Sequence, residues 1–315
     1  MDSLIFSLNS TIPVFLVMIL GYFLMRIKFF NEEFVQVADK FVYRVGLPVL
    51  LFKQVATADI HSDFDIRFVL FCMGTTTLMF ALCLLIGKIF LRDKTMVGAF
   101  AQASARGSAA ILGIAFIENI YGSSGMGPLM IISAVPLYNI YSVIILTFNS
   151  KDRDSGKGAI KKSLINIAKN PVIIGILAGL PFSIIGIEIP AIPLKTISTV
   201  AQTATPVALL VVGAGFKGKQ AIAKLGPSIA ATVLKLIGWP LVFMPIAVYM
   251  GFRNEALIAI IVMLGAPTTV TSYIMAKNMG NDEVLSSSVI VMTTLLSSVT
   301  LTLWIFVMKT LQLIM

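Results

Sequence analysis

Arg106 is the residue whose type and setting point most directly to chemistry. It lies within an apolar stretch, directly before Gly107 and Ser108, and no acidic residue falls within one helical turn of it. Because an unpaired guanidinium is costly in hydrocarbon, Arg106 must face water, a distant carboxylate or a bound anion. We expect it to hold an anion, and a structural ion pair with Asp39 is the alternative.

A second cluster, Gly265, Pro267, Thr268 and Thr269, lies in a comparable apolar stretch of the second half of the chain. Gly tolerates unusual dihedral angles and Pro removes a backbone donor, so we expect one helix to break here and another at Gly107. The second half of a broken helix begins with free N–H groups and a partial positive charge, which suits an anion. The expected substrate-binding residues are Arg106, Gly107, Ser108, Tyr138, Asn139, Gly265, Pro267, Thr268 and Thr269. The alternative for each hydroxyl or amide, and for Thr271 and Ser272 beside them, is an interhelical hydrogen bond.

Asp39 and Glu118 are the two carboxylates placed to couple transport to protons. Coupling to Na⁺ through hydroxyls and carbonyls stays open, as does transport driven by the membrane potential alone, and no other cofactor is expected. Asp39, Lys40 and Arg44 fit a gate or a packing network as well as a site. Lys235 lies within an apolar helix, and its long stem predicts that the amine snorkels to the cytoplasmic interface.

Catalytic and metal chemistry are not expected. No histidine, cysteine pair or carboxylate pair falls at membrane depth in the sequence, so the groups for acid–base or metal-assisted catalysis are missing. Cys72 and Cys83 would lie about 16 Å apart along one helix, too far to form a disulfide. His61 lies in a polar connection, where we expect it to be solvated.

The elements that position these residues must be membrane-spanning helices. Of the 315 residues, 57% are hydrophobic and 12% are charged, and the mean hydropathy is +0.95. These apolar residues would overfill any interior that the chain could enclose, so lipid must solvate much of the surface. Apolar runs of spanning length predict ten spans, at about 4–25, 34–55, 66–91, 95–119, 125–148, 164–187, 192–215, 221–250, 254–277 and 283–309.

The basic residues predict the orientation of these spans. Fifteen Lys and Arg residues lie in the loops and span ends of one side, and five lie in those of the other. The positive-inside rule makes the first side cytoplasmic and places both termini outside the cell. Because the charge is distributed by membrane side, the net charge of +9 does not indicate nucleic acid as a partner. The first apolar segment lacks the basic flank of a signal peptide, so we expect a retained helix.

Helix breakers recur in the two halves of the chain at a constant separation of 158 residues. The pairs are Pro13 and Pro171, Gly21 and Gly179, Pro48 and Pro206, Gly107 and Gly265, and Gly122 and Gly280. This spacing predicts two five-helix repeats, residues 1–148 and 164–315, joined by a polar cytoplasmic linker at 149–163. Because five is an odd number of spans, the second repeat enters the membrane inverted, as is common among secondary transporters.

The sequence resembles the auxin efflux carrier family, which includes the plant PIN carriers and bacterial permeases for small organic anions. The resemblance covers nearly the whole chain and rests on LPVLLF in span 2, RGSAAILGIAFIENIYG in span 4 and GAPTTVTSYIMAKNMGNDEVLSSSVIVMTTLLS in spans 9 and 10. It implies an all-α, ten-span fold similar to that of bile-acid symporters and NhaA-like antiporters. Spans 1, 2, 6 and 7 would form a scaffold that pairs into a homodimer. Spans 3–5 and 8–10 would form a moving transport domain that crosses at broken spans 4 and 9.

One departure from the family pattern bears on the substrate. The plant carriers have Pro and Asn at the crossing in span 4, where this sequence has Gly107 and Ser108 preceded by Arg106. This difference favours a smaller or more highly charged anion, such as a dicarboxylate, over auxin itself. We expect an efflux carrier or permease of the plasma membrane for dicarboxylates or auxin-like carboxylates, working by elevator-type alternating access. The alternatives are a Na⁺- or H⁺-coupled uptake symporter for similar anions and a membrane sensor that binds ligand without transport.

Overall fold

The computed structural model describes residues 2–57, 65–109, 126–151, 159–216 and 218–314. Every regular element within these ranges is helical. The α-helices are α1 (Asp2–Arg26), α2 (Glu32–Phe41), α3 (Leu47–Ala56), α4 (Ile66–Phe90), α5 (Val97–Ala105), α7 (Gly127–Phe148), α8 (Ala159–Ala168), α9 (Pro171–Ile185), α10 (Ala191–Ala214), α11 (Gly218–Ala223), α12 (Leu225–Val233), α13 (Trp239–Tyr249), α14 (Asn254–Gly265), α15 (Thr271–Asn278) and α16 (Glu283–Thr310). Short π-helices, Val42–Gly46 and Leu234–Gly238, join α2 to α3 and α12 to α13.

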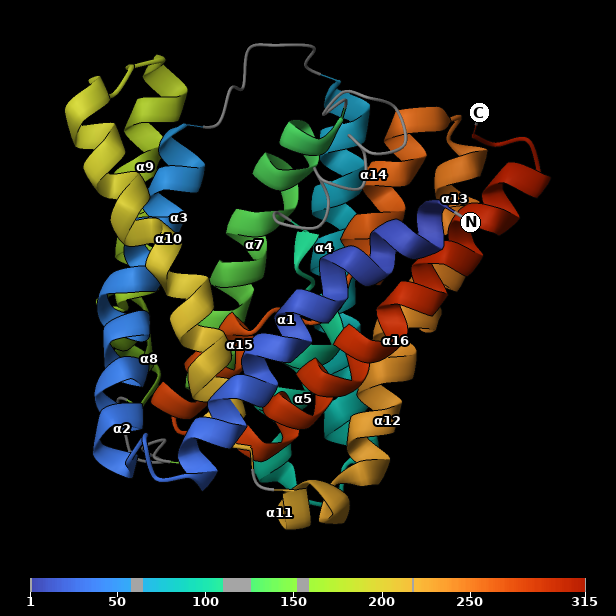
Figure 1. Cartoon of the computed structure of the whole chain (residues 1–315). Helices are drawn as coiled ribbons and strands as arrows, with labels where there is room; N and C mark the ends of the chain where they lie inside the picture. The colour runs from blue at the N-terminus through green and yellow to red at the C-terminus, as the bar shows by residue number, and fades with distance from the viewer. Residues whose placement is uncertain (1, 58–64, 110–125, 152–158, 217, 315) are drawn as a thin grey trace.

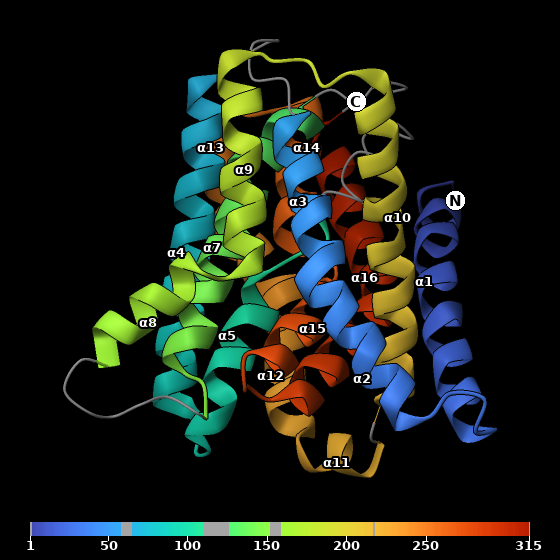
Figure 2. The ribbon, with the colours of Figure 1, turned by 90° about the vertical axis from the view of Figure 1, so that its left-hand side faces the viewer.

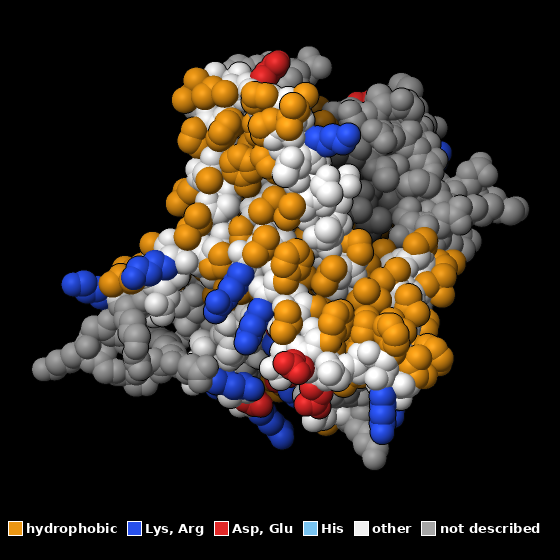
Figure 3. Space-filling model, turned by 60° about the vertical axis from the view of Figure 1, so that its left-hand side comes forward, with side chains coloured by type: hydrophobic (Ala, Val, Ile, Leu, Met, Phe, Trp, Pro, Cys, Tyr) orange, Lys and Arg blue, Asp and Glu red, His pale blue; other side chains and the backbone are white. Residues whose placement is uncertain are grey.

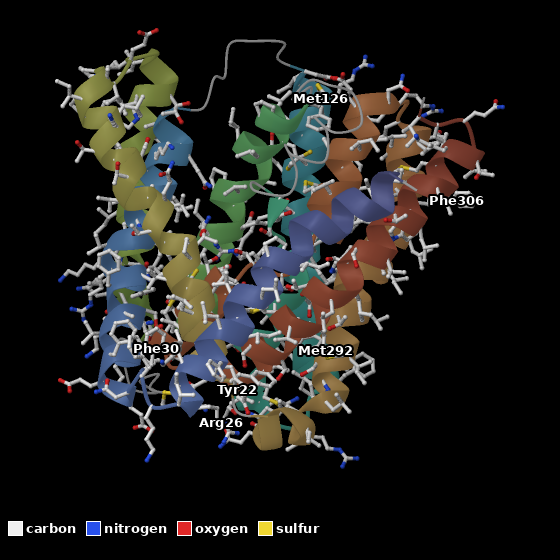
Figure 4. All side chains as sticks on the ribbon, in the orientation of Figure 1. Tyr22, Arg26, Phe30, Met126, Met292 and Phe306 are labelled. Carbon is white, nitrogen blue, oxygen red and sulfur yellow. The ribbon has the colours of Figure 1, made fainter. Side chains whose placement is uncertain are left out.

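Five helical segments in the described ranges are long and apolar enough to cross a membrane. They have 22 to 28 residues and are Ile66–Phe90, Gly127–Phe148, Ala191–Ala214, Leu225–Tyr249 and Glu283–Thr310. Figure 3 shows hydrophobic side chains over the upper and middle parts of one face, with most of the visible Lys and Arg side chains toward its lower end. At the lower end of α1 (Figure 4), the Arg26 guanidinium donates to the Tyr22 hydroxyl at 2.7 Å. Aromatic and basic side chains of this kind are typical of a membrane–water interface, and the chain is a multi-pass membrane protein.

Helices α9, α3, α10 and α1 pack side by side as a panel (Figure 2). Two close approaches within the panel require glycine. A Cβ atom on Gly21 of α1 would overlap the backbone of Leu210 in α10, and one on Gly179 of α9 would overlap the backbone of Phe52 in α3. Gly21 and Gly179 are one of the pairs separated by 158 residues, so corresponding positions of the two halves make corresponding contacts.

The other long helices build a second body with its own apolar core. Phe68 and Phe80 of α4, Met130 of α7, Phe243 of α13 and Ile305 of α16 belong to this core. Within it, every residue of α5 is buried, as is every residue of α14 from Leu257 to Gly265. A helix that is apolar on all sides is covered by its neighbours. The panel helices instead keep one exposed apolar face, as the exposed Leu16 and Phe23 side chains of α1 illustrate.

The chain leaves helical geometry in the middle of both segments that were predicted to break (Figure 1). Helix α5 ends at Ala105, and Arg106 is extended, with φ −81° and ψ 121°. Helix α14 ends at Gly265, and α15 begins at Thr271 after an extended segment. The two extended segments cross, since Gly107 and Thr268 form an antiparallel bridge. Residues 110–119, the rest of predicted span 4, lie outside the described ranges.

The two π-helices fall within the predicted spans 34–55 and 221–250. Each π-helix ends two residues before a proline, Pro48 or Pro240. A proline has no N–H group and its ring clashes with the carbonyl four residues earlier. Near Pro240 that carbonyl, Leu236 O, accepts a hydrogen bond from Trp304 Nε1 at 3.1 Å, so a residue of α16 compensates for the missing donor.

The predicted sixth span, 164–187, is divided into α8 and α9. Asn170 separates them, because its side chain accepts a hydrogen bond from Val172 N at 2.9 Å and Pro171 disfavours helical geometry at the residue before it. Helix α8 begins at Ala159 and so includes the last residues of the predicted linker. It projects away from the panel in Figure 2.

Candidate functional site

A small cavity lies where the two extended segments cross. Its volume is about 50 Å³, which is room for a few water molecules or a carboxylate group. Six of the predicted substrate-binding residues line it: Arg106, Gly107, Ser108, Tyr138, Asn139 and Thr269. The other lining residues come mainly from α3 and also from α7, α10 and α15: Leu47, Leu50, Leu51, Gln54, Val135, Thr205 and Thr271. The cavity is therefore bounded by the panel on one side and by the second body on the other.

Arg106 is the basic residue that lines this cavity. It is 5% exposed, and it donates from Nη2 to Asn139 Oδ1 at 2.7 Å and from Nη1 to the sulfur of Met275 at 2.8 Å. Both acceptors are neutral, and two buried carboxylates of the described chain, Asp282 and Asp39, pair with Lys224 and Lys277 instead. A buried guanidinium that has neutral partners and borders a cavity is suited to bind an anion, because an anion would supply the missing counter-charge.

Asn139 and Tyr138 of α7 both line the cavity but have different roles. Asn139 Nδ2 donates to Val135 O at 2.8 Å, which leaves Oδ1 directed at Arg106 and fixes the guanidinium. Tyr138 donates through its hydroxyl to Met263 O at 3.0 Å. That carbonyl lies four residues before Pro267, which has no N–H group to bond it. The Tyr138 hydroxyl is therefore used to complete the end of α14.

Three other predicted binding residues, Gly265, Pro267 and Thr268, do not line the cavity. The carbonyl of Pro267 accepts a hydrogen bond from Ser108 N at 2.8 Å. Thr268 donates from Oγ1 to Ala103 O at 2.7 Å, and its backbone N donates to a hydroxyl of α16 at 3.0 Å. Buried extended backbone must find partners for its polar groups, so Pro267 and Thr268 hold the crossing together in this conformation. The contact of the three residues with substrate stays a prediction.

Asp39, a predicted ion-coupling residue, is not at the crossing. Its Oδ2 accepts a hydrogen bond from Asn278 Nδ2 at 3.0 Å and lies 3.5 Å from Lys277 Nζ. It thus joins α2 to the last turn of α15, and the alternative of an ion pair with Arg106 is excluded. Glu118, the other predicted coupling residue, and His61 lie outside the described residues.

The prediction that Lys235 snorkels to the interface is wrong. Lys235 is fully buried, and its Nζ atom donates to Leu264 O at 2.8 Å, Met263 O at 3.3 Å and Ala105 O at 3.4 Å. The sequence did contain a signal for this burial. Lys235 lies at the middle of predicted span 221–250, about 20 Å from either end of such a helix, which exceeds the reach of a lysine stem. Gln54 and Thr205 were also missed, because nothing in the local sequence distinguishes them from other polar residues of apolar helices.

A second cavity, of about 170 Å³, adjoins the first. The two cavities share Gln54 and Val135 as lining residues. The second cavity is also lined by Val55 and Ser183, near the upper ends of α3 and α9 in Figure 1, whereas α2, which carries Asp39, lies at the lower end. The crossing is therefore adjoined by open space toward one end of the molecule, and the Asp39 contact lies toward the other.

Comparison with known proteins places the chain among transporters. A family model described as "Membrane transport protein" matches residues 6–305. "Uncharacterized transporter YfdV" of Escherichia coli (strain K12) is 24% identical over 320 residues, covering 97% of this chain and 99% of that protein. "Putative malonate transporter" of Rhizobium meliloti (strain 1021) is 28% identical over 301 residues, 92% of each chain. The match spans almost all of the chain, both broken segments included, so the chain belongs to the membrane transport protein family, the auxin efflux carrier family that its sequence resembles.

Proposed function

We propose that the protein is a secondary transporter of small organic anions, with dicarboxylates such as malonate as its substrate class. The observation that carries this proposal is the Arg106 guanidinium, which is buried, borders the cavity at the crossing and has two neutral hydrogen-bond acceptors among the described residues. One carboxylate of the substrate would bind there, with Ser108 and Thr269 as further hydrogen-bond partners. The cavity of about 50 Å³ admits one carboxylate group, and the rest of the anion would extend toward Gln54, which lines both cavities.

The charge at the crossing supports a substrate with more than one negative charge. Arg106 and Lys235 are both buried, and the groups that they contact in the described structure are neutral. Two buried cations near one site, neither with an acidic partner among the described residues, favour a dianion over a monoanion on simple electrostatic grounds. The name of the Rhizobium meliloti relative points to the same class, because malonate is a dicarboxylate.

Alternating access by an elevator-type motion is the proposed mechanism. The panel would be the scaffold and the second body the moving transport domain, within two inverted repeats of five spans each. Support comes from the cavity between the two bodies, from the apolar core that the second body has of its own and from the corresponding contacts of Gly21 and Gly179. The Asp39 contact with Lys277 and Asn278 would close one end, and it would have to break when the site opens there.

Location in the cell membrane, with both termini outside, follows from the distribution of basic residues between the loops. In this orientation the closed end is cytoplasmic. Export of an anion from a negative cell interior is favourable without a coupling ion, so efflux is the proposed direction.

Flux through sealed vesicles tests the proposed function. Purified protein in proteoliposomes is expected to transport radiolabelled malonate, in competition with other dicarboxylates, and Arg106→Gln is expected to abolish the signal. Equal flux through the wild type and Arg106→Gln would contradict the role of Arg106. Flux that requires a Na⁺ or H⁺ gradient would identify an uptake symporter, and ligand binding with no flux would identify a membrane sensor.

A further inference from the structure

Lys235 lies where the C-terminal ends of two broken helices converge. The three carbonyls that surround its Nζ atom belong to the last residue of α5, Ala105, and to the last turn of α14, Met263 and Leu264. The carbonyls of a last helical turn have no partner within their own helix, and the end of a helix carries a partial negative charge. Two such ends therefore face one point, and Lys235 occupies it.

The geometry around Lys235 suits the charged form of its amine. A neutral amine has two N–H donors, whereas an ammonium group has three donors and no acceptor. Three carbonyl oxygens lie within 3.4 Å of Nζ, and no other hydrogen bond of that atom is found among the described residues. Three acceptors match the three donors of an ammonium ion, and among the described residues these acceptors are all backbone oxygens.

Backbone carbonyls at the C-terminal ends of half-helices are ligands that secondary transporters use for a coupling cation. In this chain such oxygens converge, but a side chain supplies the cation. Gly107 separates this cation from the anion cavity, since a Cβ atom on Gly107 would lie 2.8 Å from Lys235 Nζ while Gly107 also lines the cavity. The positive charge is thus one backbone segment away from the site at Arg106.

We propose that the Lys235 ammonium is the resident cation of the crossing, filling a monovalent-cation site formed by the carbonyls of Ala105, Met263 and Leu264. The site would accept Na⁺ or a small alkylammonium ion once the side chain is removed. One consequence is that anion binding needs no Na⁺, and this consequence rests on the proposed function. Because Lys235 belongs to the second body, its charge would move together with the anion.

A thermal-stability experiment without any anion substrate tests the cation site directly. Wild type, Lys235→Ala and the exposed-residue control Lys40→Ala are unfolded in detergent, in equal concentrations of choline, Na⁺ or n-propylammonium chloride. The propylammonium ion replaces the part of the side chain that Ala lacks. We expect it, and more weakly Na⁺, to raise the Tm of Lys235→Ala over its value in choline by about 2–4 °C or more, with no difference for the wild type or Lys40→Ala. No cation-specific rise in Lys235→Ala, or a Na⁺-specific rise in the wild type, would overturn the proposal.

Lys235→Ala is expected to be purified in folded form more readily in propylammonium than without it. If it can be purified only in propylammonium, or cannot be purified at all, two further variants test the proposal. Lys235→Arg keeps a positive charge, and Lys235→Met has a similar length without charge or donors. The proposal requires Lys235→Arg to be the more stable of the two and requires Lys235→Met to show no response to either cation, because its side chain fills the site. A Lys235→Met protein as stable as the wild type would show that no cation is needed there.

The two proposals can fail separately. Absence of malonate flux in the wild type would reject the proposed substrate and leave the stability result unchanged, because that experiment contains no anion. Conversely, Na⁺-dependent malonate transport by the wild type would uphold the function and reject a resident cation.

Discussion

The two cations buried at the crossing of α5 and α14, Arg106 and Lys235, are held in different ways. Lys235 has three backbone carbonyls around its amine, and it does not line the cavity at the crossing. Arg106 has one amide oxygen and one sulfur atom as acceptors, and it borders a cavity. The first cation completes the fold, because it satisfies carbonyls that the broken helices leave free. The second cation, Arg106, can still bind a ligand in the cavity. Burial of a charged side chain therefore does not by itself identify a binding site, because the protein's own acceptors can satisfy all of its hydrogen bonds.

Among the substitutions that test this difference, Arg106→Gln is expected to have the largest effect, on the affinity for malonate. Loss of a charge-assisted hydrogen bond is expected to weaken malonate binding by about 10- to 100-fold, with a small change in Tm. Isothermal titration in detergent measures the affinity. Arg44→Gln is the matched control, because Arg44 is exposed on the π-helix of the panel; its affinity should equal that of the wild type. If Arg106→Gln binds malonate as the wild type does, the anion binds elsewhere.

Gly107→Ala tests whether the Lys235 side of the crossing is closely packed. The added Cβ atom would lie 2.8 Å from Lys235 Nζ and 3.2 Å from its Cε atom, so the ammonium group would have to leave its carbonyls. Overpacking of this kind costs about 1–3 kcal/mol, and thermal unfolding should show a lower Tm. Gly74→Ala in α4 is the control, since nothing lies within 4 Å of its added Cβ atom. Equal Tm values for the two variants would mean that Lys235 is free to move.

Tyr138→Phe tests whether a hydroxyl of a residue that lines the cavity takes part in anion binding. The Tyr138 hydroxyl donates to Met263 O, which also accepts a hydrogen bond from Lys235. Its removal should cost about 0.5–1.5 kcal/mol of stability, since the carbonyl keeps one donor. We expect the affinity for malonate to be unchanged, because the hydroxyl faces backbone. A clear loss of affinity with normal stability would place the hydroxyl in the anion site.

The smallest effect is expected from a double-mutant cycle between Arg106→Gln and Asp39→Asn. Asp39 is bonded to Asn278 and lies beside Lys277, so its substitution should act independently of Arg106. Unfolding free energies of the two single variants should then add, with a coupling energy below about 0.5 kcal/mol. A coupling of about 1 kcal/mol or more would indicate that the two residues do interact in the protein.

Much of the fold follows from local properties of the chain. Apolar runs identify the helices, and Gly107 with Gly265 and Pro267 marks the two places where helical geometry is lost. The charge of Arg106 within an apolar run marks the candidate site. Each of these signals lies within one or two helical turns, because hydrophobicity, missing N–H donors and dihedral preference are properties of neighbouring residues. The division between α8 and α9 had such a local signal too, in Asn170-Pro171.

Only the tertiary structure decided which partner each buried polar group has. Lys235 meets Ala105, 130 residues away, and Arg106 meets Met275, 169 residues away. The same holds for Pro267 and Thr268, which hold the crossing together, and for Asp39, whose partners lie on α15. Sequence alone shows that a buried charge needs a partner, since leaving it unpaired is costly. Which partner it finds depends on how helices far apart in the chain pack, and that packing makes one cation part of the fold and leaves the other beside the cavity.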